Sequence, residues 1–131
     1  MGGHLSGLVG WGMPSLTSVV GAATATFSAA LVVAPRVLIG PTGMPDTAQT
    51  RALVRALGAR DAVSGLAMLA APGGRVRDVA AAARVLSDCA DAAVLPSAVP
   101  DRGRAALLRA SAAAWGALAL AAAVLDRRAG R

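Results

Sequence analysis

The sequence predicts an all-α protein: an integral membrane four-helix bundle that forms one domain over residues 1–131. The chain is 56% hydrophobic and has a mean hydropathy of +0.60. Only 15% of its residues are charged, against about 25% in soluble domains. Aromatic residues make up 2% of the chain, which is too few for a large aromatic core. Ala and Gly supply the bulk instead, and they let helices approach closely in lipid.

The first helix is predicted near residues 15–35. This segment carries no charged residue and is long enough to cross a hydrocarbon core of ~30 Å. Gly21, Ala25 and Ala29 recur every four residues, a spacing that favours close contact with a second helix. Residues 36–46 are rich in Pro and Gly, so they are expected to form a loop.

The second helix is predicted near residues 48–71. Asp46 is expected to be its N-cap, and Gln49 would complete a capping box. The first half of this helix is amphipathic because it carries Arg51, Arg55 and Arg60, and the second half is apolar. The helix spans a bilayer only if its Arg-bearing half lies in the interface, where long side chains can reach water.

Proline and glycine separate the remaining two helices. Pro72-Gly73-Gly74 ends the second helix, and the third is predicted near residues 78–96, closed by Pro96. Asp101 is expected to cap the fourth, near residues 104–126. Four such helices make the chain a multi-pass protein of the plasma membrane.

Ionisable residues interrupt the third apolar segment. Arg84, Asp88 and Asp91 stand at i, i+4 and i+7, so they share one face of a helix. Charged groups inside a membrane are costly, and they mark a functional site by default. We expect Arg84 to pair with Asp88 within the helix and Asp91 to find a partner on another helix. The alternative is an ion-pair network that only fixes helix register.

A second pair of charges, Arg60 and Asp61, opens the apolar half of the second helix. Small residues at Ser64 and Gly65 share the Asp61 face, so Asp61 is expected to face the bundle interior. The surrounding pattern over residues 58–65 is G-x-R-D-x-x-x-G. With the third-helix Asp, it resembles a family of small four-helix bacterial membrane proteins known as a domain of unknown function. The resemblance covers residues 15–126 and implies the four-helix fold, but little about activity.

Five ionisable residues are therefore predicted to converge at one site: Asp88, Asp91, Arg84, Asp61 and Arg60. Paired carboxylates near a guanidinium can divide acid and base roles. This favours an acid/base enzyme that opens an epoxide, isomerises a double bond or cyclises a lipophilic small molecule. The Asp/Arg/Asp set resembles that of the limonene epoxide hydrolase family in residue types only. The competing interpretation is a structural or accessory membrane subunit without catalysis.

The expected partners follow from charge and residue usage. No cofactor or metal is expected, because Cys89 and His4 are the only cysteine and histidine; Cys89 is expected to be a buried apolar residue. The net charge of +6 comes from scattered Arg residues, which favours anionic lipid head groups over nucleic acid. Expected partners are the bilayer, a lipophilic small molecule, and a second copy or the helices of another membrane protein. An Arg-only, Asp-only charge set resembles high-GC bacterial proteins.

Overall fold

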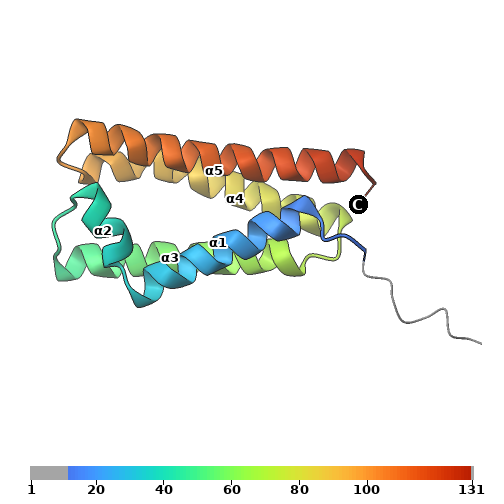
Figure 1. The fold of residues 1–131 in the computed structure, drawn as a ribbon, viewed down its shortest axis with the longest axis horizontal. Coiled ribbons are helices and arrows are strands. Elements are labelled where there is room, and N and C mark those ends of the chain that lie inside the picture. Colours follow the sequence, from blue (N-terminus) through green and yellow to red (C-terminus); the bar gives the residue numbers. More distant parts are fainter. Residues whose placement is uncertain (1–11, 131) are drawn as a thin grey trace, which may run out of the picture.

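The computed structural model describes residues 12–130, and this part of the chain is helical without any strand. Figure 1 shows long helices lying side by side, with α4 and α5 above α1 and α3, and the short α2 at one end. The all-helical class is therefore confirmed. The elements are α1 (Leu16–Val33), α2 (Arg36–Thr42), α3 (Ala48–Ala70), α4 (Gly74–Val94), the short 3-10 helix η1 (Leu95–Ala98) and α5 (Arg102–Arg128).

Side-chain oxygens cap three of the long helices at their N-termini. Ser15 accepts a hydrogen bond from the backbone N–H of Ser18, and Asp101 accepts one from Arg104 at 2.8 Å. The predicted cap at Asp101 is confirmed. The predicted cap at Asp46 is wrong, because Thr47 caps α3 by accepting from the N–H of Thr50.

Helix α2 lies where the sequence predicts a loop, so that prediction is wrong over Arg36–Thr42. Proline is harmful mainly in the interior of a helix, and Pro41 stands one residue before the end of this one. Gly43, at a φ of 68° in the left-handed region, ends the helix. Ile39 is buried against Leu31 and other apolar residues, and this burial holds α2 against the bundle.

Helices α1 and α3 cross at a point where only glycine fits. A Cβ on Gly21 would lie 2.6 Å from the Gly65 carbonyl oxygen, and one on Gly65 would lie 2.6 Å from the Ala25 nitrogen. The predicted small-residue contact is confirmed at Gly21 and Ala25, whereas Ala29 is exposed. The crossing also fixes the rotation of α3, and hence the direction of Asp61, which lies between Gly58 and Gly65 in the sequence.

A buried carboxylate joins the end of α5 to the beginning of α1. Asp126 is 2% exposed, and its two oxygens accept hydrogen bonds from the backbone N–H groups of Leu16 at 2.9 Å and Thr17 at 2.7 Å. These N–H groups have no partner within their own helix. Asp126 therefore closes the bundle at the end opposite α2 (Figure 1).

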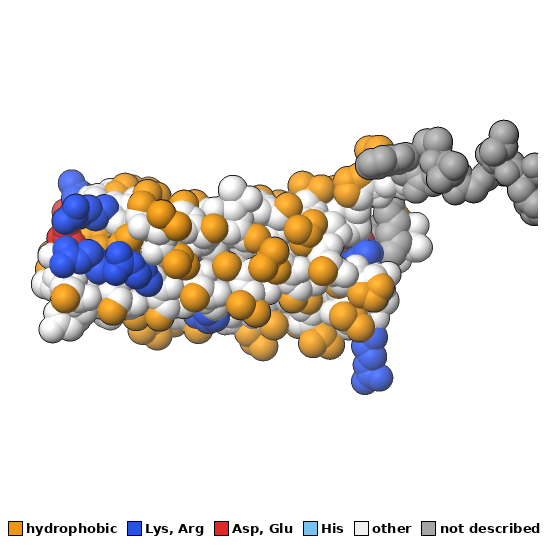
Figure 2. Space-filling view, turned by 90° about the horizontal axis from the view of Figure 1, so that it is seen from below, with side chains coloured by type: hydrophobic (Ala, Val, Ile, Leu, Met, Phe, Trp, Pro, Cys, Tyr) orange, Lys and Arg blue, Asp and Glu red, His pale blue; other side chains and the backbone are white. Residues whose placement is uncertain are grey.

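Two helices, α1 and α5, are long and apolar enough to cross a membrane. The sequence predicts four spans, and by this criterion α3 and α4 do not qualify. The reason is charge: α4 alone carries Arg75, Arg77, Asp78, Arg84, Asp88 and Asp91. Figure 2 shows hydrophobic side chains spread along one side of the bundle, while Arg side chains gather mainly at the end where α2 lies.

Candidate functional site

The centre of the candidate site is an ion pair within α4. The Arg84 Nε donates to Asp88 Oδ2 at 2.9 Å, and its Nη2 donates to Asp88 Oδ1. Arg84 is 3% exposed and Asp88 2% exposed, so this pair is removed from solvent. The i, i+4 spacing predicts this contact, and the structure shows it.

Asp91 takes its partner from the neighbouring helix. Arg60 on α3 approaches it with both terminal nitrogens, at 3.1 Å for Nη1 to Oδ1 and 2.6 Å for Nη2 to Oδ2. The Asp91 side chain is 13% exposed and that of Arg60 38% exposed, so this pair lies nearer the surface. An inter-helix partner for Asp91 is what the sequence predicts.

Asp61 connects the two ion pairs. Its Oδ1 accepts a hydrogen bond from Arg60 Nε at 2.8 Å and lies 3.0 Å from Arg84 Nη1. The five predicted residues therefore form one continuous network between α3 and α4. Small side chains around Asp61 allow this, because Gly58 and Gly65 bring α1 close behind it.

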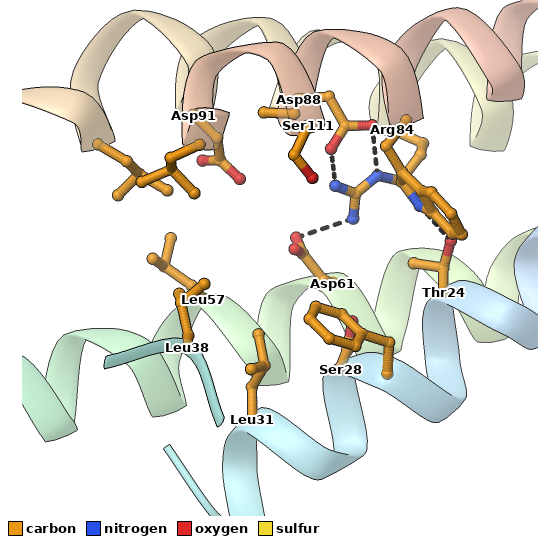
Figure 3. A pocket seen from close by; sticks show the side chains of 15 residues that line it. Thr24, Ser28, Leu31, Leu38, Leu57, Asp61, Arg84, Asp88, Asp91 and Ser111 are labelled. Carbon is orange, nitrogen blue, oxygen red and sulfur yellow. Dashed lines mark hydrogen bonds and ion pairs between the residues drawn. The ribbon is translucent and has the colours of Figure 1, made fainter. Parts of the chain in front are cut away.

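The network borders a cavity of about 320 Å³. That volume is within the range of small-molecule sites, ~300–1,000 Å³. Figure 3 shows Asp61 projecting from α3 toward Arg84 and Asp88 on α4, with Asp91 beside them. Arg60 does not line the cavity and lies at the exposed edge of the network. The other walls are mostly apolar and come from α1, α2, α3, η1 and α5: Phe27, Leu31, Leu38, Leu57, Leu95, Leu108, Ala112 and Trp115.

Polar residues outside the predicted site also line the cavity. Trp115 Nε1 donates to Thr24 Oγ1 at 2.9 Å. Ser28 is 2% exposed, and no residue among 12–130 hydrogen-bonds its hydroxyl, so that hydroxyl is free to meet a ligand. Thr24 and Ser28 stand at i and i+4 on the same apolar helix as Gly21. This repeat of polar residues is the feature of the sequence that could identify them as site residues.

Other candidates from the sequence are not part of the site. Cys89 is exposed, so its expected burial is wrong; its side chain lines a shallow groove between α4 and α5, not the core. His4 lies outside the described residues. Within residues 12–130, no three His, Cys, Asp or Glu side chains meet as metal ligands would.

Comparisons with protein-family models, curated proteins and solved structures give no match for this chain.

Proposed function

We propose that the protein is a multi-pass membrane protein of the plasma membrane. The support is that α1 and α5 bury only 33% and 22% of their most apolar windows inside the bundle. The core helix of a soluble protein would be mostly buried, and lipid is the solvent that suits such faces. In this proposal α3 and α4 also cross the membrane beside them. Helix α4 directs Arg84 and Asp88 into the bundle, and Arg residues near the ends of α3 and α4 reach the head groups.

Extraction tests this placement. Membranes that contain the protein are washed with alkaline carbonate and then with high salt, and the protein is expected to stay in the pellet until detergent is added. Release of the protein by either wash would contradict the proposal.

Within this bundle, we propose an acid/base enzyme that acts on a lipophilic small molecule by epoxide opening, double-bond isomerisation or cyclisation. One observation supports it above all: three carboxylates from two helices line a single apolar cavity. Asp88 and Asp91 each accept two N–H groups from one guanidinium, which fixes the orientation of both carboxylates at the cavity wall. Asp61 faces the cavity from the opposite helix.

The chemistry needs one proton delivered and one removed. In isomerisation, a carboxyl group protonates one alkene carbon and a carboxylate takes a proton from a carbon nearby, so atoms and charge balance. In epoxide opening, the proton goes to the oxygen as its C–O bond breaks, and the added water loses a proton to a carboxylate. The free hydroxyl of Ser28 is available to hold a substrate oxygen.

Substitution of the carboxylates tests this proposal. Vesicles containing the protein are incubated with a panel of small terpenoid alkenes and epoxides in D₂O, and mass spectrometry detects deuterium at carbon or diol formation. Asp88→Asn and Asp91→Asn are each expected to lower turnover by ~10²-fold or more, since Asn cannot transfer a proton. Asp78→Asn changes another Asp of α4, one that pairs with Arg127 of α5. It is the matched control and is expected to keep activity. Equal turnover in all variants would contradict the assignment.

A structural role is the second candidate, because all three carboxylates contact a guanidinium and the network joins α3 to α4. In that case the protein is an accessory subunit, and its charges fix helix register. Asp88→Asn and Asp91→Asn would then be lost from the membrane or melt early in detergent, instead of remaining folded and inactive.

A further inference from the structure

Two polar atoms at the cavity wall have no hydrogen-bond partner among residues 12–130. One is the hydroxyl of Ser28 on α1, a residue that is 2% exposed. The other is Oδ2 of Asp61 on α3, because the contacts of this side chain with Arg60 and Arg84 are made by Oδ1. Both side chains line the cavity. Buried polar groups normally have partners, so a molecule bound in the cavity is the source that remains for these two.

Ser28 and Asp61 lie beside each other across the contact between α1 and α3. A Cβ on Gly58 would lie 2.8 Å from the carbonyl oxygen of Ser28, and one on Gly65 would lie 2.6 Å from the backbone nitrogen of Ala25. Asp61 stands between these two glycines in the sequence, at spacings that put it on their side of α3. Figure 3 shows Asp61 and Ser28 next to each other at the cavity. One polar group of a ligand can therefore reach both unpartnered atoms.

The chemistry of the two atoms selects an alcohol. A carboxylate oxygen only accepts hydrogen bonds, whereas a serine hydroxyl without an acceptor has a proton to donate. An alcohol oxygen satisfies both, because it donates its proton to Asp61 and accepts the proton of Ser28. An ether or epoxide oxygen has no proton for Asp61, and an ammonium group has no lone pair for Ser28.

The rest of the cavity suits a hydrocarbon. Its other walls are mostly aliphatic and aromatic, as is usual for sites in which a few polar groups orient an apolar ligand. We propose that this cavity binds a lipophilic alcohol, whose hydroxyl lies between Oδ2 of Asp61 and Oγ of Ser28.

This inference deepens the proposed function and rests on it for the reaction, but not for binding. A hydroxyl held on the α1–α3 side leaves the hydrocarbon chain to the rest of the cavity, which Asp88 and Asp91 of α4 also line. The substrate class is then an unsaturated lipophilic alcohol. Isomerisation or cyclisation of its alkene adds a proton to one carbon and removes a proton from another, and the hydroxyl is unchanged.

Fluorescence can measure binding, because Trp115 lines the cavity. The other tryptophan, Trp11, is replaced by Phe in every protein tested, and this Trp11→Phe protein is the reference. Three probes share one carbon skeleton: geraniol, its methyl ether and the dimethyloctadiene that lacks the oxygen. All are titrated in the same detergent, with correction for partition into micelles. The reference protein is expected to bind geraniol about tenfold more tightly than the ether, and the ether more tightly than the hydrocarbon.

Two variants separate the partners of the hydroxyl. Ser28→Ala removes the donor, so it should weaken geraniol and its ether by the same factor, about fivefold, and leave the hydrocarbon unchanged. In Asp61→Asn the guanidiniums hold the amide oxygen at the Oδ1 position, so the amide NH₂ takes the place of Oδ2. This variant should lose most of the preference for geraniol over the ether. Thr26→Val, which removes an exposed hydroxyl of α1, and Asp78→Asn should behave like the reference.

Several results would overturn the inference. One is equal affinity of the reference protein for geraniol and the hydrocarbon. A second is an undiminished preference for geraniol over the ether in Asp61→Asn, since the preference would then reflect the size of the methyl group. A third is binding of geranylamine without binding of geraniol. If Asp61→Asn does not fold, the uncharged change Ser28→Ala decides, and an equal loss for geraniol and the hydrocarbon contradicts the site.

The outcome is distinguishable from failure of the enzyme proposal, because binding is measured without turnover. A protein that prefers geraniol but converts no alkene or epoxide supports the alcohol site and contradicts the enzyme. Turnover that depends on Asp88 and Asp91, with no preference for geraniol over the hydrocarbon, supports the enzyme and overturns the alcohol site.

Discussion

Arg60 and Asp91 are separated by 31 residues in the sequence and meet through two hydrogen bonds, the shorter of them 2.6 Å long. They join the middle of α3 to the last turns of α4 at the outer edge of the cavity. Arg60 also holds Asp61 at 2.8 Å, so one guanidinium sets the separation of two carboxylates that belong to different helices.

Removal of this link should loosen the α3–α4 contact. Arg60→Gln is expected to lower the free energy of unfolding in detergent by about 1–2 kcal/mol, because two carboxylates lose charged donors while the partial exposure of Arg60 reduces the loss. Thermal unfolding followed by circular dichroism measures the change. Arg128→Gln, at an exposed position of α5, is the control for loss of one positive charge. An equal shift in both variants would show that the ion pair contributes nothing specific.

At the buried Arg84–Asp88 pair, the double change should be less destabilising than the single change. Arg84→Met leaves Asp88 buried without its partner and is expected to cost about 3–5 kcal/mol. Arg84→Met combined with Asp88→Leu removes both charges, and this variant should recover most of that loss. Denaturation of both proteins under the same conditions gives the comparison. A double variant less stable than the single one would refute this account of the pair.

The glycine crossing of α1 and α3 should tolerate no added methyl group. Gly65→Ala places a Cβ 2.6 Å from the Ala25 backbone nitrogen, so the helices must separate at an expected cost of about 1–3 kcal/mol. Gly40→Ala is the matched control, since nothing lies within 4 Å of its Cβ position, and it should be neutral or slightly stabilising. Similar melting temperatures for the two variants would contradict the close approach.

Asp46 gives a prediction about pH outside the candidate spans. Its hydrogen bond from Arg36, with help from Arg51, holds the pKa of Asp46 below its ordinary value. Because the folded pKa is lowered, the stabilisation is present above the pKa of the unfolded chain and is lost as pH falls through the folded pKa. Carbon NMR of the Asp46 carboxyl group should show this low titration, and Arg36→Gln should raise the pKa. Arg102→Gln, an exposed change at the same end, should not.

Local spacing accounts for the part of the site that the sequence predicts. Arg84 and Asp88 meet because i and i+4 are neighbours on any helix. That Asp91 needs a partner elsewhere follows from the same geometry, but the identity of that partner depends on how α3 packs against α4. The bridging position of Asp61 depends on the Gly21–Gly65 crossing, which involves two glycines 44 positions apart.

The cavity itself could not be predicted from sequence. Its walls combine Leu38 of α2 and Ser28 of α1 with Leu108 of α5, which lies 70 positions or more from both in the chain. The sequence also predicts a loop where α2 lies, because Pro41 and Gly43 indicate a break. The burial of Ile39 outweighs that signal, and this burial depends on tertiary packing.

The contact between Asp126 and the first turn of α1 has a consequence for synthesis on the ribosome. The N–H groups of Leu16 and Thr17 emerge more than a hundred residues before the carboxylate that satisfies them. Until residue 126 leaves the exit tunnel, the start of α1 must use water, lipid head groups or a chaperone in its place. The bundle therefore acquires its final order at that end last, and a ribosome that stalls within α5 leaves a nascent chain in which the first turn of α1 lacks its carboxylate partner.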